Sequence, residues 1–292
     1  MEKSKQHSRE GCSLRCDLHT HSVFSDGTYT PTELVAEAKR LGLIIALTDH
    51  NTVAGLPEFT EAAKRLGVTA VPGVEISTEH NGKELHLLGL FVFPEHYAAV
   101  ERMVKEQHVL KEISNMELVE RLNQAGYLID YVKVKGRNPN GNANRAHVAA
   151  ELLEQGYVTS VREAFDTILS DHGGFYVPPS RLQLIDVIKE LRRIGVLPVL
   201  AHPLQELTES ELRELLPDAI EAGLIGMETT HSSYAPETID LAEVMAQEHH
   251  LLSSGGSDFH GSVKPDVSLG TGKGWLCVPE KIYMQLLGAR NS

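Results

Sequence analysis

The chain has 292 residues and carries 27 Lys and Arg against 40 Asp and Glu, a formal net charge of -13. This acidic balance argues against a protein that follows a long phosphate backbone with a basic surface. Aromatic residues make up only 5% of the chain, which argues against stacking platforms for long single-stranded nucleic acid. The length and the 41% hydrophobic content allow one large domain, with or without an insertion.

The cellular location is predicted from three features. The first residues, MEKSKQHSREG, are charged and lack the apolar stretch of a signal peptide. The longest apolar run, LGLIIAL from Leu41, is too short to span a bilayer. Three cysteines without a CxxC pair favour reduced thiols. We therefore expect a cytoplasmic protein with no membrane association.

Short β-type runs alternate with helical patterns through most of the chain. In TPTELVAEAKRLG, Thr30 is the expected N-cap, Pro31 lies in the first turn and Gly42 ends the helix. A second helical pattern ends in the same way at Gly67. Such alternation predicts parallel strands with helices outside, in an open sheet or a closed barrel. The expected strands are residues 14–18, 44–47, 70–74, 85–93, 196–201, 224–228 and 251–254.

One segment departs from this alternation. Between about residues 97 and 174 there is no convincing strand, but a long amphipathic stretch, the turn GRNPNGNANR and two shorter helical patterns. About eighty residues exceed an ordinary connection between strands. We expect an inserted helical subdomain over residues 97–174, with the hypothesis that it acts as a lid, and a barrel built from residues 12–96 and 175–292.

Polar side chains that can bind metal recur at the ends of the expected strands. In a parallel α/β protein the carboxyl ends of the strands share one face, so these side chains should meet there. One such histidine is more often a hydrogen-bonded rim residue than a ligand, and Asp26-Gly27 alone indicates a turn. So many buried acids and imidazoles without a cation would be costly. The residues are His19, His21, Asp26, Asp49, His50, Glu75, His86, His202, Glu228, His231, Asp258 and His260.

This donor set predicts a particular class of metal site. Mixed His, Asp and Glu ligands suit Mn, Fe or Zn better than Ca or Mg, and their number indicates two or three divalent ions. Neighbouring metals activate water and neutralise a phosphoryl group, and the chain contains no GxSxG elbow, P-loop or GxGxxG motif. The leading prediction is phosphoester hydrolysis by attack of a metal-bound hydroxide.

The motifs DLHTHSVFSDG, ALTDHNT, PGVEIS, LHLLGL, LAHP and GSDFHG resemble, in order, those of the PHP (polymerase and histidinol phosphatase) superfamily. The resemblance implies a distorted seven-stranded (β/α)7, TIM-like barrel. It also implies three ligand sets, of which the third, together with the bridging Glu75, would be catalytic. The sets are His19, His21, Glu75 and Asp258; Glu75, His86 and His202; and Asp26, His50 and His260.

The helical insertion resembles that of the TrpH/YciV-like nucleotide phosphoesterase branch. The resemblance implies substrate-binding roles for Arg145 and His147 in NRAHVAA, although Arg145 can equally be a solvated helix start. Arg181 is the corresponding basic residue in YVPPSR, followed here by Leu182 where that branch usually has an aromatic residue. His231 would contact the substrate or support a ligand. Asp49 would orient the His50 imidazole.

The resemblance implies a small phosphorylated substrate, a nucleotide or short oligonucleotide. An example is removal of the 3'-phosphate of a nucleoside 3',5'-bisphosphate to give a 5'-mononucleotide. Histidinol phosphate phosphatase activity is the main alternative. A metal-dependent amidohydrolase would usually place a bridging lysine near the fourth strand, where this chain has His86. A non-catalytic PHP module would have lost ligands, and all nine positions are filled here.

Overall fold

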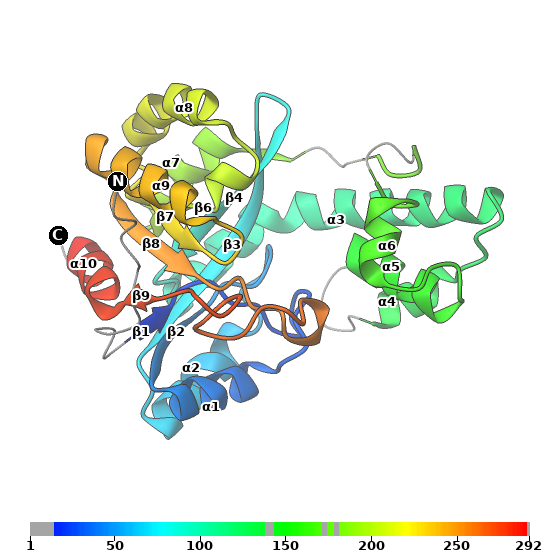
Figure 1. Ribbon diagram of the computed structural model, residues 1–292, viewed down its shortest axis with the longest axis horizontal. Helices are drawn as coiled ribbons and strands as arrows, with labels where there is room; N and C mark the ends of the chain where they lie inside the picture. The colour runs from blue at the N-terminus through cyan, green and yellow to red at the C-terminus, as the bar shows by residue number, and fades with distance from the viewer. Residues whose placement is uncertain (1–14, 138–142, 171–173, 178–180, 291–292) are drawn as a thin grey trace, which may run out of the picture.

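The computed structural model describes residues 15–137, 143–170, 174–177 and 181–290. A curved sheet forms a barrel, and a group of helices extends from one side of it (Figure 1). The strand order is β8-β7-β6-β4-β3-β2-β1-β9, and β5 pairs with β3. The strands are β1 (Arg15–Asp17), β2 (Leu43–Leu47), β3 (Ala70–His80), β4 (Lys83–Leu90), β5 (Leu182–Gln183), β6 (Leu197–Ala201), β7 (Gly226–His231), β8 (Leu252–Gly256) and β9 (Val278–Pro279).

The barrel closes between the ends of β1 and β8. The backbone N–H of Leu18 donates to the carbonyl of Gly255 (3.1 Å), and the N–H of Asp258 donates to the carbonyl of His19 (2.9 Å). These bonds continue the sheet beyond both strands and pair the first and last expected strands of the chain. The prediction of a seven-stranded, TIM-like barrel is confirmed, and the two-residue strands β5 and β9 are additions to it.

The prediction that all strands run parallel is wrong for β4, which pairs antiparallel with both β3 and β6. The turn before β4 is a two-residue hairpin loop, because His80 pairs with Lys83 across it. Asn81 and Gly82 both have positive φ, 52° and 77°, as a type I′ turn requires. An Asn-Gly pair between strands is a strong hairpin signal, so the sequence did contain this information. His86 therefore lies near the start of its strand, not at its carboxyl end.

Helices cover the outside of the barrel, and the expected caps are present. Thr30 and Glu33 form a capping box at α1, and Gly42 ends that helix with a φ of 64°. Gly67 ends α2 in the same left-handed conformation. The helices are α1 (Pro31–Leu41), α2 (Leu56–Leu66), α3 (Pro94–Gln124), α4 (Tyr131–Gly136), α5 (Arg145–Glu154), α6 (Val161–Asp166), α7 (Leu184–Arg193), α8 (Glu209–Ala222), α9 (Pro236–Glu248) and α10 (Glu280–Arg290), with 3-10 turns η1 (Pro203–Gln205) and η2 (Gly261–Val263).

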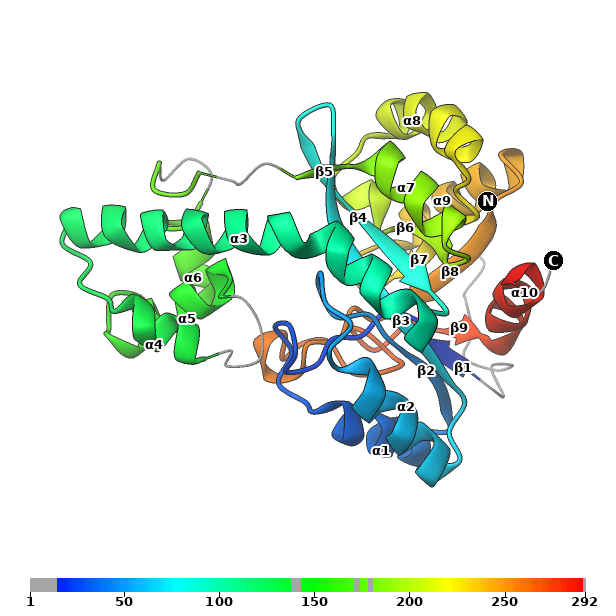
Figure 2. The ribbon, with the colours of Figure 1, turned by 180° about the vertical axis from the view of Figure 1, so that it is seen from behind.

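The long helix α3 belongs to both parts of the molecule. Val100 and Val104, near its start, pack into the core between the sheet and its outer helices. Leu118 and Leu122, near its end, belong to a separate apolar cluster with residues of α4, α5 and α6. Both ribbon views show α3 leaving the barrel and carrying the three shorter helices (Figure 2). The subdomain limits at residues 97 and 174 stay a prediction.

Two further features concern the sequence-based expectations. Cys16 is a buried free thiol, whereas Cys277 is disulfide-bonded, against the expectation of reduced thiols for that residue. Cys12 and Leu14, the first residue of an expected strand, lie outside the described residues. No helix in the described part of the chain combines the length and the apolar character needed to cross a bilayer.

Candidate active site

The first histidine pair follows β1 directly and faces the barrel rim. His19 and His21 are two residues apart in extended backbone, so their side chains leave on the same side. Thr20 points the opposite way, and its hydroxyl donates to the carbonyl of Ala46 (2.5 Å). A Cβ at Gly27 would lie 2.4 Å from the carbonyl oxygen of His21, so the turn closes only with glycine there.

Asp49 holds this turn together, which differs from the predicted role of orienting an imidazole. Its carboxylate accepts from the backbone N–H of Ser22 (2.7 Å) and from the Ser22 hydroxyl (2.6 Å). The hydroxyl of Ser25 donates to the same carboxylate (2.6 Å). Asp49 thus fixes the loop that carries Asp26 toward the rim.

The carboxylate of Glu75 lies at the centre of the histidine cluster. Its Oε2 is 3.1 Å from His19 Nε2 and 3.2 Å from His21 Nε2. Its Oε1 is 2.8 Å from His86 Nδ1 and 3.1 Å from His202 Nε2. Each carboxylate oxygen therefore faces a different pair of imidazoles, which is the arrangement expected of a bridging ligand.

The antiparallel direction of β4 explains why His86 reaches this cluster. His86 pairs in register with Ser77 of β3 and Ala201 of β6, immediately before His202. Because β4 runs opposite to its neighbours, the start of β4 lies at the same rim as their carboxyl ends.

The carboxylate of Asp26 is surrounded by a second group of histidines in the cluster. Its Oδ1 lies 3.2 Å from His260 Nε2 and 3.9 Å from His21 Nδ1, and its Oδ2 lies 3.8 Å from His50 Nε2. The three residues of the predicted third set are therefore together. His21 is added to them, because one ligand atom from each of the four residues falls within a common 4.8 Å.

Asp258 divides its two oxygens between the cluster and a lysine. Its Oδ1 lies 3.3 Å from His21 Nε2 and 3.7 Å from His19 Nε2. Its Oδ2 accepts from Lys264 Nζ (2.6 Å) and lies 3.6 Å from His231 Nε2. Lys264 was missed by sequence reasoning, because a lysine four residues beyond His260 in a loop carries no periodic or motif signal.

The donor atoms of this cluster fit a metal centre. They lie close together, yet several have no hydrogen-bond partner among the described residues, because their mutual angles do not suit one. Buried polar atoms normally have hydrogen-bond partners. Several buried nitrogen and carboxylate oxygen atoms that lack partners and face one place therefore indicate a bound cation. These atoms are Asp26 Oδ1, His50 Nδ1, Glu75 Oε2, His86 Nδ1 and His231 Nε2.

The proton affinities of the imidazoles support the same conclusion. Burial lowers the pKa of His50 to about 3, and burial also lowers the pKa of His202. Both are therefore neutral, as metal ligation requires. Burial disfavours charge on His86 as well, but the Glu75 carboxylate outweighs it and raises the pKa of His86 to about 10. The buried acids thus attract positive charge at this place, which a divalent cation would supply.

Glu228, which the sequence analysis counted among the possible metal-binding side chains but placed in no ligand set, is a positioning residue. It is fully buried, and its two oxygens lie 3.1 and 3.2 Å from His19 Nδ1. Its Oε2 also accepts from the backbone N–H of His202 (2.8 Å). An acid on Nδ1 fixes the imidazole so that Nε2, which faces Glu75, is available for ligation. The isolated acid in the otherwise uncharged run LIGMETTH was the available signal.

Three of the predicted substrate-binding residues lie where the helices meet the barrel, whereas His231 ends strand β7. The guanidinium of Arg145 lies over the Tyr176 ring, 4.3 Å from its centroid. Arg181 Nη2 donates to Glu84 Oε2 (2.5 Å). His147 accepts from the backbone N–H of Asn144 through Nδ1 (3.1 Å), so it caps α5.

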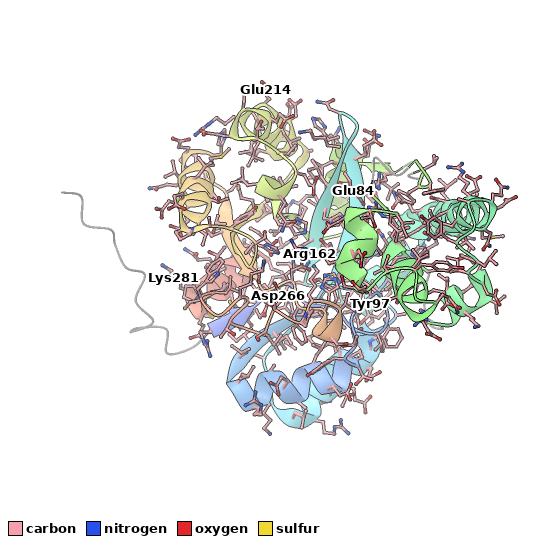
Figure 3. All side chains as sticks on the ribbon, turned by 45° about the vertical axis from the view of Figure 1, so that its right-hand side comes forward. Glu84, Tyr97, Arg162, Glu214, Asp266 and Lys281 are labelled. Carbon is pink, nitrogen blue, oxygen red and sulfur yellow. The ribbon has the colours of Figure 1, made fainter. Side chains whose placement is uncertain are left out.

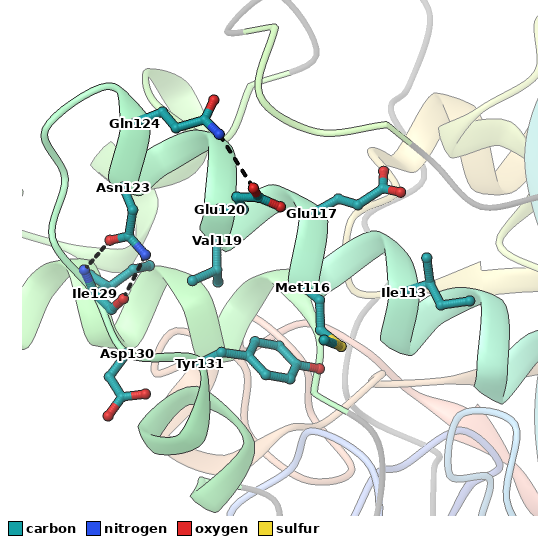
Figure 4. A pocket seen from close by; sticks show the side chains of 10 residues that line it. All are labelled: Ile113, Met116, Glu117, Val119, Glu120, Asn123, Gln124, Ile129, Asp130 and Tyr131. Atoms are coloured by element: carbon teal, nitrogen blue, oxygen red, sulfur yellow. Dashed lines mark hydrogen bonds between the residues drawn. The ribbon is translucent and has the colours of Figure 1, made fainter.

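A hollow on the far part of α3 offers a contrasting environment (Figure 4). It is lined by apolar, amide and acidic side chains, and its ten lining residues include no histidine or cysteine. This hollow therefore lacks the imidazoles that characterise the barrel rim. The lining residues are Ile113, Met116, Glu117, Val119, Glu120, Asn123, Gln124, Ile129, Asp130 and Tyr131.

Comparison with known proteins places this site in a family. Residues 17–177 match the PHP domain. A 5'-3' exoribonuclease of Haemophilus influenzae is 33% identical over 84% of this chain and 89% of its own length. A 3',5'-nucleoside bisphosphate phosphatase of Chromobacterium violaceum is 31% identical over 84% of this chain and 86% of its own length.

A solved structure shows the same architecture. The protein from Bifidobacterium adolescentis, described as a metal-dependent phosphoesterase, is 29% identical and superposes with a TM-score of 0.83. The superposition covers 95% of this chain and 96% of that one. The domain match and the curated relatives, which act on phosphate esters, show that this chain belongs to the PHP family.

Proposed function

We propose that the protein is a metal-dependent phosphoesterase that removes phosphate from a small nucleotide or trims short oligonucleotides. One observation carries this proposal: all nine predicted ligands converge at one barrel rim, and four of them present buried atoms without hydrogen-bond partners among the described residues. The nucleotide substrate class is supported by the activities named for the relatives.

The proposed ligands form three overlapping sets. His19, His21, Glu75 and Asp258 would hold one ion, and Glu75 with His86 and His202 a second. Asp26, His50 and His260 would hold a third, with His21 within reach of it. Two or three Mn, Fe or Zn ions suit these donors. Bound there, the ions supply positive charge for the phosphoryl oxygens and lower the pKa of water.

The protein side chains around this centre have separate tasks. Asp26, His50, His260 and Glu75 are the proposed catalytic residues. Arg145, His147, Arg181 and His231 are the proposed substrate contacts, and a guanidinium suits phosphate oxygens because it donates two parallel hydrogen bonds.

The helices α3–α6 extend from one side of the barrel (Figure 1), and Asn144 Nδ2, at the start of α5, donates to Asp26 Oδ2 (3.2 Å). We therefore propose the segment of residues 97–174 as a lid. The barrel of residues 12–96 and 175–292 would carry the metal ligands. A cytoplasmic location remains part of the proposal.

The test is phosphate release from a panel of substrates by protein purified without chelator, with Mn added. The panel contains adenosine 3',5'-bisphosphate, short oligonucleotides, histidinol phosphate and a generic aryl phosphate. We expect the highest kcat/KM with the nucleotide or the oligonucleotides. Preference for histidinol phosphate would overturn the substrate class, and inactivity on every ester would overturn the proposal as a whole.

A further inference from the structure

The outer face of α3 carries a row of exposed apolar side chains. Val109, Ile113 and Met116 are 55%, 47% and 52% exposed. They are four and three residues apart, so they lie on one face of the helix. The opposite face holds the buried Val104 and Leu118, which pack into the two cores that α3 joins. Figure 2 views the molecule from the side of α3. The packing of α3 within one copy of the chain therefore uses the other face of the helix.

The hollow of Figure 4 extends this apolar row. Ile113 and Met116 are among its lining residues, and Ile129 and Tyr131, from the chain that follows α3, line its other side. Single exposed apolar residues are common on protein surfaces, but a contiguous apolar patch is typical of an interaction surface. We call Val109, Ile113 and Met116, together with this hollow, the α3 patch.

Charged side chains lie on both sides of the α3 patch, in line with it. The exposed Arg102 precedes Val109 by seven residues, and the exposed Glu120 follows Ile113 by seven residues. Seven residues are about two helical turns, so both side chains lie on the same helix face as the apolar row. The patch thus has a basic residue at one end and an acidic residue at the same distance from its other end. Figure 3 shows all described side chains, including those of α3, as sticks and labels Glu84 near the border between the barrel and the helices.

These two charges have no counter-charge bound to them within the described part of the chain. None of the salt bridges among the described residues includes Arg102 or Glu120. The Gln124 amide is the only side-chain hydrogen-bond donor to Glu120 recorded there, at 3.4 Å. The Arg193 guanidinium, with a smaller contribution from Arg102, lowers the pKa of Glu190, so Arg102 lies near an acid that is already paired with Arg193.

A second copy of the same helix fits this surface. When two α3 helices pack antiparallel with Val109 of one against the partner's Ile113, Arg102 of one lies opposite the partner's Glu120. This follows because the seven-residue spacing is the same at both ends of the row. Parallel packing would instead place like charges side by side. A two-fold axis brings a surface patch onto its own copy, and two-fold dimers are the commonest homo-oligomers.

We propose that the α3 patch is the interface of a two-fold symmetric dimer of this protein, in which the two α3 helices pack antiparallel. The patch is small and bordered by charge, whereas permanent dimers use larger and more hydrophobic interfaces. The dimer is therefore reversible. None of the proposed metal ligands or substrate contacts belongs to the patch, so this inference is independent of the proposed activity.

The test is sedimentation velocity of the full chain over a range of protein concentrations. We expect a reversible shift from monomer to dimer with a Kd of roughly 10 µM. Ile113→Glu should weaken the dimer by roughly 100-fold or more, because the two-fold axis places two such charges in the apolar contact. The matched control is Met284→Glu on α10, which is 53% exposed in the wild type and lies outside the patch, and it should keep the wild-type Kd.

Charge reversal tests the antiparallel arrangement. Arg102→Glu and Glu120→Arg should each weaken the dimer by roughly tenfold, because a single substitution replaces both symmetric attractions with repulsions. An equimolar mixture of these two variants should recover most of the wild-type affinity, since opposite charges face each other again in the mixed dimer. Circular dichroism of each variant verifies that it is folded.

Three results would overturn the proposed interface. The first is a wild-type protein that stays monomeric up to roughly 100 µM. The second is a dimer that Ile113→Glu weakens no more than Met284→Glu does, because that dimer would use another surface. The third is a dimer whose Kd is unchanged by either charge reversal, which would contradict the antiparallel packing of the two helices.

Discussion

Glu228→Gln tests whether the cluster is a metal centre. The substitution keeps the side-chain volume, but replaces one carboxylate oxygen with an NH2 group. If the remaining side-chain oxygen still accepts the hydrogen bond from the backbone N–H of His202, the NH2 group faces His19 Nδ1. Nδ1 then accepts a hydrogen bond and the ring proton moves to Nε2, the atom 3.1 Å from Glu75 Oε2. A protonated Nε2 cannot bind a metal.

The expected loss follows from how partners of metal ligands behave. Removing such a partner typically costs 10–100-fold in metal affinity, or about 1.4–2.7 kcal/mol. The assay strips the protein with chelator and titrates Mn or Zn against a competing chromophoric chelator, with bound metal counted by elemental analysis.

The matched control is Glu151→Gln, another fully buried acid, whose carboxylate pairs with Arg137 Nη2 (2.6 Å) in the helical insertion. Both variants lose a buried charge-assisted contact, but only Glu228→Gln should lose metal affinity. Wild-type metal affinity in Glu228→Gln, or an equal loss in Glu151→Gln, would refute this reasoning.

The remaining predictions concern the ligands, the metal and the barrel closure. Asp258→Asn should lower phosphate release by roughly a hundredfold or more. The variant should keep the fold, because Asp258 has a φ of 55° that asparagine tolerates, and circular dichroism would verify this. Turnover equal to that of the wild type would show that Asp258 is not a metal ligand. Removing bound metal with chelator should lower the Tm by roughly 5 °C or more, since a ligand at about 100 times its Kd stabilises the folded protein by about 2.7 kcal/mol. The measurement is scanning fluorimetry, and a Tm that responds neither to chelator nor to added Mn would contradict the metal centre. Gly256→Ala should cost roughly 1–3 kcal/mol in urea unfolding, because a Cβ there would lie 2.5 Å from the Cβ and backbone nitrogen of His19. A Cβ added at Gly288, within α10, would meet no atom of another segment within 4 Å, so Gly288→Ala should gain roughly 0.5–1 kcal/mol. Similar changes in both variants would contradict the close approach at Gly256.

The hairpin that carries His86 shows which features of the fold local sequence patterns predict. Strand positions and helix caps such as Thr30 and Gly42 follow from short-range chemistry, and the structure confirms them. The direction of β4 depends on the two residues Asn81 and Gly82, whose left-handed backbone makes a tight hairpin. The sequence analysis assumed regular βα alternation and therefore predicted a parallel strand in place of this hairpin. The rim position of His86 was right, but the reason for it was the antiparallel strand.

The supporting residues around the ligands were harder to predict. Glu228 reaches His19 across 209 positions of sequence, and Lys264 reaches Asp258 from the residue after the short turn η2. No periodicity connects such pairs, because their proximity arises only when the barrel closes.

By itself the sequence determined which donor types follow which strands, because strand ends, caps and turns depend on neighbouring residues. It also determined the PHP family, since six motifs occur in order. Only the tertiary structure decided which donors meet on Glu75 and which acid fixes the His19 imidazole. Those features are distances between remote segments, which local preferences do not specify.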